Sequence, residues 1–134
     1  MRNLGAVLVA LVALTVGFAA CAPPPTVHHL DYDRLGIHTA VVIGGQAQID
    51  EGLVVQVPWL EPRIWLAAHA NAAGGPFHAL LAARAGDRVC VDQRCYQVTF
   101  TAAVPAVGGV TRVLGPLVLQ TSLPDNRRLL VSCN

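Results

Sequence analysis

Short apolar runs, separated by turn residues, dominate the chain after its first 33 positions. Most are β-branched or alternate apolar with polar residues, and Gly, Pro, Asp or Asn bounds them. The runs that predict strands are Leu35–Ile37, Thr39–Ile43, Leu53–Val57, Ile64–Ala68, Arg88–Val91, Tyr96–Val104, Leu117–Thr121 and Leu129–Ser132. One short helix is predicted over Phe77–Ala83, after Pro76. Eight short strands with one small helix favour an all-β fold, a closed or nearly closed β-barrel.

The N-terminal segment differs from this pattern and reads as a secretory signal. An uncharged apolar run of 17 residues, Leu4–Ala20, follows Arg2 and leads to Cys21 and three prolines. Small residues just before Cys21 indicate a lipoprotein signal, with Cys21 lipidated; an uncleaved membrane anchor is the alternative. We therefore expect a signal or anchor segment over 1–21, a Pro-rich spacer over 22–33 and one domain over 34–134, outside the cytoplasmic membrane.

Charge excludes some partners. The chain has nine Lys+Arg against eight Asp+Glu, and all nine basic residues are arginine. Removing Arg2 leaves a balanced domain without a basic run, so nucleic acid is not an expected partner. About 110 residues suit one domain with one core.

One histidine stands where a strand can present it for chemistry. The apolar run Ile64–Ala68 ends on His69, and Gly74-Gly75-Pro76-Phe77 and Ala85-Gly86-Asp87-Arg88-Val89 follow. A histidine delivered by the end of a buried strand is held by a fixed scaffold. Together with the segment Arg34–Val42, this spacing resembles the sortase family over about Leu35–Ser132, nearly the whole domain.

The resemblance implies a sortase-type closed β-barrel and an activity. Sortases are extracellular cysteine transpeptidases whose nucleophile ends a strand in a Thr-Leu-x-Thr-Cys motif, with an arginine at the start of the next strand. They cleave a Thr-Gly bond in a peptide sorting signal such as LPxTG, and an amine acceptor or water resolves the thioester. For this chain the resemblance implies His69 as the acid/base residue, a sorting-signal peptide and an amine as partners, and no cofactor.

Two alignments compete for the nucleophile. In the first, Val118–Ser122 occupies the motif, so that Ser122 replaces the cysteine, Thr121 lies beside it in the substrate site, and Arg128 or Arg127 supplies the arginine. In the second, Leu129–Cys133 is the motif and Cys133 is the nucleophile. Only Asn134 then follows, so a barrel strand would be missing. We favour the first alignment because barrel closure constrains the whole domain.

A serine at this position changes the expected activity. A thiol near an arginine and a histidine becomes reactive at neutral pH, whereas a hydroxyl needs a general base that a third group holds in place. Sortases generally lack such an acid, and Asp125 is not expected to reach the far side of His69. We therefore predict a sortase-like protein with weak or no transpeptidase activity. The alternatives are a non-catalytic peptide-binding module and an active sortase that uses Cys133.

The other cysteines have structural explanations. Cys90 and Cys95 flank a turn between two predicted strands, which favours a cross-strand disulfide in an oxidising compartment. No Cys or His spacing is typical of a zinc site, so no metal is predicted. Under the first alignment Cys133 is a buried, inert thiol.

Overall fold

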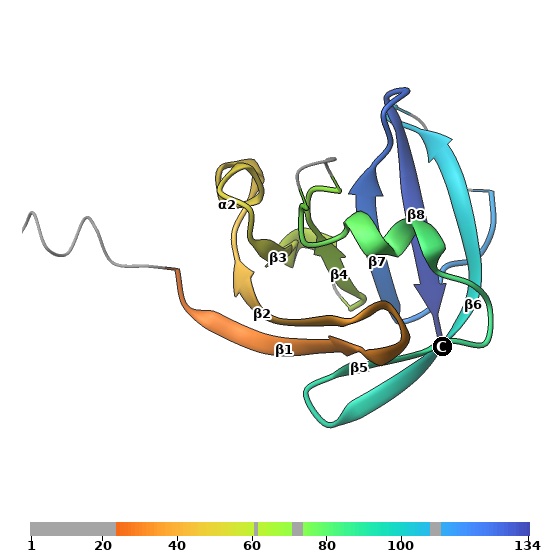
Figure 1. Cartoon of the computed structure of the whole chain (residues 1–134), viewed down its shortest axis with the longest axis horizontal. Coiled ribbons are helices and arrows are strands. Elements are labelled where there is room, and N and C mark those ends of the chain that lie inside the picture. Colours follow the sequence, from red (N-terminus) through yellow and green to blue (C-terminus); the bar gives the residue numbers. More distant parts are fainter. Residues whose placement is uncertain (1–23, 61, 71–73, 108–110) are drawn as a thin grey trace, which may run out of the picture.

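Eight strands close into a barrel in the order β1-β2-β3-β4-β7-β8-β6-β5 (Figure 1). The computed structural model describes residues 24–60, 62–70, 74–107 and 111–134. The strands are β1 (Thr26–Tyr32), β2 (Ile37–Ile43), β3 (Val54–Gln56), β4 (Ile64–Ala67), β5 (Arg88–Val91), β6 (Arg94–Pro105), β7 (Leu117–Ser122) and β8 (Arg127–Cys133). The predicted all-β barrel is confirmed.

Two of the strand pairings are parallel, β2 with β3 and β4 with β7, and the others are antiparallel. The parallel pair β4–β7 places the carboxyl ends of both strands at the same edge of the barrel. The β7–β8 hairpin then returns the chain from that edge to the opposite end, where the C-terminus lies (Figure 1).

The barrel begins earlier than predicted. Residues 26–32 of the expected spacer form β1, which pairs with β2 along its length and with β5 at Leu30 and Asp31. Leu30 and Tyr32 are buried and Asp31 between them is half-buried, so this is a strand with one buried face. His28, His29 and Asp31 obscured its alternation of apolar and polar residues. The spacer prediction is wrong over these residues. The predicted signal segment 1–21, with Cys21, lies outside the described residues.

The helices also differ from the prediction. The segment predicted as a helix forms the 3₁₀ turn η3 (His78–Ala82), which buries Leu80. Residues 33–35 form another, η1 (Asp33–Leu35), so that of the strand expected over Leu35–Ile37 only Ile37 is extended, as the first residue of β2. Gly36 ends η1 with φ +66°, a conformation that glycine adopts without strain. A third 3₁₀ turn is η2 (Pro58–Leu60). Among the described residues, the α-helix is α2 (Gln46–Asp50), between β2 and β3, which the sequence analysis missed. Among the described residues, no helix is both long and apolar enough to cross a bilayer.

The two faces of β4, β7 and β8 bury different sets of side chains. The main core inside the barrel includes Leu66, Leu117 and Leu119. Because neighbouring residues of a strand point to opposite faces, Val118 and Leu130 point outward, where they form a smaller cluster with Val104, covered in part by Trp65. This outer face carries the candidate site at one end.

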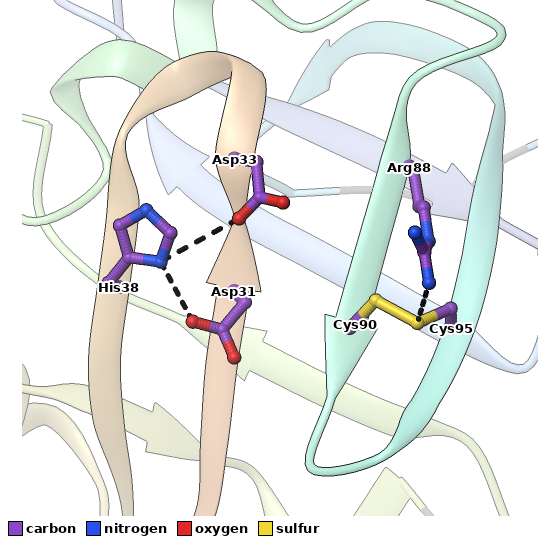
Figure 2. The surroundings of a disulfide bond; sticks show 6 residues. All are labelled: Asp31, Asp33, His38, Arg88, Cys90 and Cys95. Atoms are coloured by element: carbon purple, nitrogen blue, oxygen red, sulfur yellow. Dashed lines mark hydrogen bonds and ion pairs between the residues drawn. A yellow bond between two sulfur atoms is a disulfide. The ribbon is translucent and has the colours of Figure 1, made fainter.

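A disulfide joins the neighbouring strands β5 and β6. Cys90 and Cys95 lie opposite each other in the hairpin, and the bond between them confirms the predicted pairing (Figure 2). The guanidinium of Arg88 donates a hydrogen bond to Cys95 Sγ at 3.1 Å. Figure 2 also shows the adjacent β1–β2 hairpin, where His38 Nδ1 lies 2.8 Å from Asp31 Oδ1. The β1–β5 pairing thus ties the first strand to the disulfide hairpin.

Candidate active site

The register of β4 against β7 brings His69 and Ser122 to the same place. Ala67 lies beside Gln120 in this parallel pair. Two residues further along both strands, His69 and Ser122 follow on the outer face of the barrel. The buried Thr121 hydroxyl donates a 2.8 Å hydrogen bond to the Ala68 carbonyl, which extends the connection between the two strands to this point. The sequence alone offered no measure of this proximity, since 53 positions separate the two residues that this bond joins.

Arg128 reaches the same site from β8. It lies directly opposite Ser122 in the antiparallel β7–β8 pair. Directly opposed residues point to the same face of a sheet, so Arg128 shares the outer face with Ser122. Its guanidinium also donates to the Pro105 carbonyl at 3.3 and 3.4 Å. Arg127, one residue earlier, pairs with Asp125 instead, with Nε 2.6 Å from the carboxylate.

A small pocket opens beside His69 and Ser122. It has a volume of about 50 Å³, and its lining residues are Gln46, Ile49, Ala67, Ala68, His69, Gln120, Thr121 and Ser122. The Ser122 side chain is exposed at its edge, whereas Thr121 is buried. This space admits a small group rather than a whole peptide.

The structure adds Asp50, a site residue that sequence reasoning missed. Asp50, at the end of α2, has Oδ1 2.9 Å from His69 Nε2. Gln46, one turn earlier in the same helix, donates to that carboxylate at 2.8 Å. The hydrogen bonds from Gln46 and then from His69 hold the pKa of Asp50 below its usual range. The only sequence signal was the Gln46–Asp50 spacing of four, which predicts contact in a helix but says nothing of His69.

Two polar atoms of the site have no hydrogen-bond partner in the part of the chain that the structure describes. Among the described residues, no hydrogen bond engages the Ser122 hydroxyl or His69 Nδ1. Since Nε2 faces a carboxylate, the imidazole proton belongs on Nε2, and Nδ1 keeps its lone pair. His69 and the exposed Ser122 line the same small pocket, and a nitrogen lone pair within reach of a hydroxyl is what general-base chemistry needs.

Cys133 lies away from this group. It is fully buried in the main core and faces Leu117, at the opposite end of β7 from Ser122. Burial raises the pKa of its thiol to about 12, so the thiolate that a nucleophile requires is disfavoured. In Figure 1 this end of β8 lies at the marked C-terminus, away from the β7–β8 turn.

Metal ligation finds no support in the part of the chain that the structure describes. No group of three or more His, Cys, Asp or Glu side chains there could hold an ion.

Solved sortases share the architecture described above. No family model matches the sequence, and no curated protein matches it either. A lid mutant of sortase A from Corynebacterium diphtheriae superposes with a TM-score of 0.69 at 18% identity, covering 85% of this chain and 72% of that one. Sortase E1 from Streptomyces coelicolor, solved with a tripeptide in its active site, gives 0.65 at 18% identity over 84% of this chain and 91% of that one.

A third similar structure is sortase C from Streptococcus pneumoniae. It superposes with a TM-score of 0.69 at 15% identity, over 90% of this chain and 83% of that one. The chain therefore has the sortase fold, as the sequence resemblance implied. At such low identities the superpositions establish the fold, and the function has to be argued from the site.

Proposed function

We propose that this protein is a sortase-like protein of the cell envelope that binds a peptide sorting signal of the LPxTG type. The observation that carries the proposal is the convergence of His69, Ser122 and Arg128 on one outer face, from the adjacent strands β4, β7 and β8. A histidine, a nucleophile position and a cation in one place are the parts that acyl transfer requires.

Each residue has a role in this proposal. His69 transfers protons, Ser122 occupies the nucleophile position, and Arg128 neutralises charge that develops on the carbonyl oxygen of the substrate. Thr121 contributes through the position of its backbone, because its hydroxyl is already bonded to Ala68. The pocket of about 50 Å³ would take one small group of the peptide at the scissile bond.

The setting of the reaction is part of the proposal. Cys21 would be lipidated and hold the domain at the outer side of the membrane, where sorting-signal peptides and amine acceptors meet. Mass spectrometry of the protein purified from its own cell membranes tests this: a diacylglycerol adduct on Cys21 supports lipidation, and an intact residue 1–20 segment points to the helical anchor.

A second candidate function is peptide binding without catalysis. The observation that favours it is the hydroxyl at position 122, which is far less acidic than a thiol. An enzyme that uses Cys133 has less support, because that side chain is buried at the other end of the strand pair.

The test uses the full chain in detergent, with fluorogenic LPxTG-like peptides and an amine acceptor. Wild type is compared with Ser122→Ala, Ser122→Cys and Cys133→Ala. Turnover that Ser122→Ala abolishes and Cys133→Ala leaves intact supports acyl transfer at Ser122. Binding of the peptide by wild type, with turnover only in Ser122→Cys, supports the binding module. Failure of every variant to bind or cleave any peptide of the panel overturns the proposal.

A further inference from the structure

The carboxylate behind His69 changes what a serine can do at this site. A serine hydroxyl is not ionised at neutral pH, so it attacks a carbonyl only while a base removes its proton. An isolated imidazole performs this poorly, because it must also be oriented and must carry the positive charge that it gains. A carboxylate bonded to the other ring nitrogen meets both requirements.

We propose that Asp50, His69 and Ser122 form a serine acyl-transfer site, in which Asp50 is the positioning residue that makes His69 a competent base. The peptide substrate of this site rests on the function proposed above, whereas the activation of Ser122 does not. With Asp50 as the third group, Ser122 can be active, contrary to the weak or absent activity expected for a site without such a group.

The local structure is built to hold Asp50 where it lies. Helix α2 begins after Gly45, whose amide donates to the Gln48 side chain at 2.8 Å, so the helix start is capped. Gln46 then donates to Asp50 within the same helix. Ile49 packs with Val42, Val55 and Ala67, which fixes the helix against β2, β3 and β4. The carboxylate is therefore aimed at His69 by a packed element, although 60% of its side chain is exposed.

The same helix also shapes the pocket. Gln46 and Ile49 line it together with His69 and Ser122. A group that enters the pocket therefore meets the base, the hydroxyl and the helix that holds the acid, and a substrate would cover them from water. The desolvated ion pair of Asp50 with a protonated His69 would then be stronger than it is in the open site.

The reaction balances with these residues and an amine. The Ser122 oxygen forms a bond to the scissile carbonyl carbon, its proton passes to His69 Nδ1, and the carbonyl electron pair moves to the oxygen, where Arg128 stabilises it. Collapse breaks the carbon–nitrogen bond, and the leaving amine takes the proton from His69, which leaves an ester on Ser122. An acceptor amine, or water, then attacks the ester by the reverse sequence and regenerates the hydroxyl.

This mechanism predicts a coupling between residues 50 and 122. A thiol beside a histidine can ionise without a carboxylate behind that histidine. The activity should therefore depend much less on Asp50 when a cysteine occupies position 122. A merely structural role of Asp50 would lower activity equally in both backgrounds. The Ser122→Cys variant is thus the background that separates positioning from structure.

The experiment compares Asp50→Asn in the wild-type and the Ser122→Cys background, with the full chain in detergent. In wild type we expect kcat to fall by about 100-fold or more while KM changes little. In Ser122→Cys we expect a fall of less than about fivefold. Glu51→Gln, the exposed neighbouring carboxylate, serves as the matched control and should leave both rates unchanged. Equal losses in both backgrounds, or no loss in wild type, overturn the inference.

A second readout needs no peptide. A fluorophosphonate probe phosphonylates an activated serine, with loss of fluoride, and we expect it to label Ser122 in wild type and not in Asp50→Asn. Labelling that depends on Asp50, with no peptide bound or cleaved, would retain the serine site and refute the proposed sorting-signal substrate. Peptide binding with neither labelling nor turnover would retain the proposed binding function and refute the serine site.

Discussion

Asp87 and Asp50 each pair with a basic side chain, and their surroundings differ. Asp87, just before β5, is 7% exposed and accepts hydrogen bonds from the Tyr32 hydroxyl, the Arg34 guanidinium and the Arg84 amide. Asp50 has one basic partner, His69, and its side chain is 60% exposed. The Asp87 cluster joins β1, η1 and the start of β5, whereas the Asp50 pair faces a pocket.

This difference distinguishes Asp87, a carboxylate that stabilises the fold, from Asp50, a carboxylate whose partner can take part in proton transfer. Every partner of Asp87 is a permanent donor, and the Arg34 guanidinium also bonds the Ala82 carbonyl at 2.5 Å, so the cluster is saturated. His69 is a titratable partner that keeps one ring nitrogen unengaged among the described residues. Saturated, buried charge stabilises a fold once it is formed, and an unsaturated pair beside a cavity can still move a proton.

The largest expected effect on stability follows from Asp87→Asn. It leaves the Arg34 charge and the buried Tyr32 hydroxyl without their ionised acceptor, and we expect a loss of about 3 kcal/mol in the free energy of unfolding. Urea denaturation monitored by tryptophan fluorescence measures it. Asp50→Asn, the control, should leave the urea midpoint nearly unchanged; a comparable loss there would remove the distinction between the two aspartates.

The pH dependence of stability should show the structural role of Asp87. The Arg34 guanidinium, with the hydrogen bonds of Tyr32 and the Arg84 amide, lowers the pKa of Asp87 far below its ordinary value of 3.8. Because the folded protein binds this proton more weakly than the unfolded chain, the stabilisation is complete above about pH 4 and falls as the pH decreases below it. When the pH is lowered from 6 to 2, the urea midpoint of wild type should fall, and that of Asp87→Asn should fall less. Parallel curves for the two proteins would contradict this assignment.

The disulfide ranks next. Cys90–Cys95 closes a short hairpin, so its removal by Cys90→Ala with Cys95→Ala should cost about 2 kcal/mol by loop entropy. The hairpin also holds β1 through the β1–β5 pairing, so amide exchange should increase in β1 and not at His69. Thermal unfolding and hydrogen exchange measure the two effects. Faster exchange around β4 and β7 would show that the site and the hairpin are not independent.

The sequence was sufficient for the barrel because turn residues and alternation are local signals. It failed at β1 because His28, His29 and Asp31 interrupt the apolar pattern, and pairing with β2 and β5 overrides that weak signal. The Gly-Asp pair at 86–87, which contributed to the family resemblance, places the structural carboxylate of the barrel rather than a site residue.

Asp50 was beyond sequence reasoning for a different reason. His69 and Ser122 could be paired through a motif, but the acid comes from a short helix between two other strands, and its distance to His69 depends on how β2, β3 and β4 pack. Such a contact is set by tertiary structure alone, so no spacing in the chain reports it. Thr121 was predictable in part: the motif identified the residue as part of the site, but not its hydrogen bond to the Ala68 carbonyl.

A smaller effect on stability is expected from the loss of this bond. Thr121→Val keeps the shape of a buried side chain and removes the hydroxyl that donates to the Ala68 carbonyl. We expect a cost of about 1 kcal/mol, since one buried hydrogen bond is lost. Because the bond ties the end of β7 to the residue before His69, the distance between Ser122 and His69 should also change, and acyl-transfer activity should fall several-fold.

Thr99→Val is the matched control for Thr121→Val. Its hydroxyl, on β6, likewise donates to a carbonyl of a neighbouring strand, that of Ser132 in β8 at 3.1 Å. Ser132 pairs with Val118, four residues before Ser122 in β7, so this bond lies away from the site. It should lower stability by a similar or smaller amount and leave activity intact. Equal activity in both variants would mean that the Thr121 bond stabilises the barrel without positioning the site, and the geometry of Ser122 and His69 would then depend on β-pairing alone.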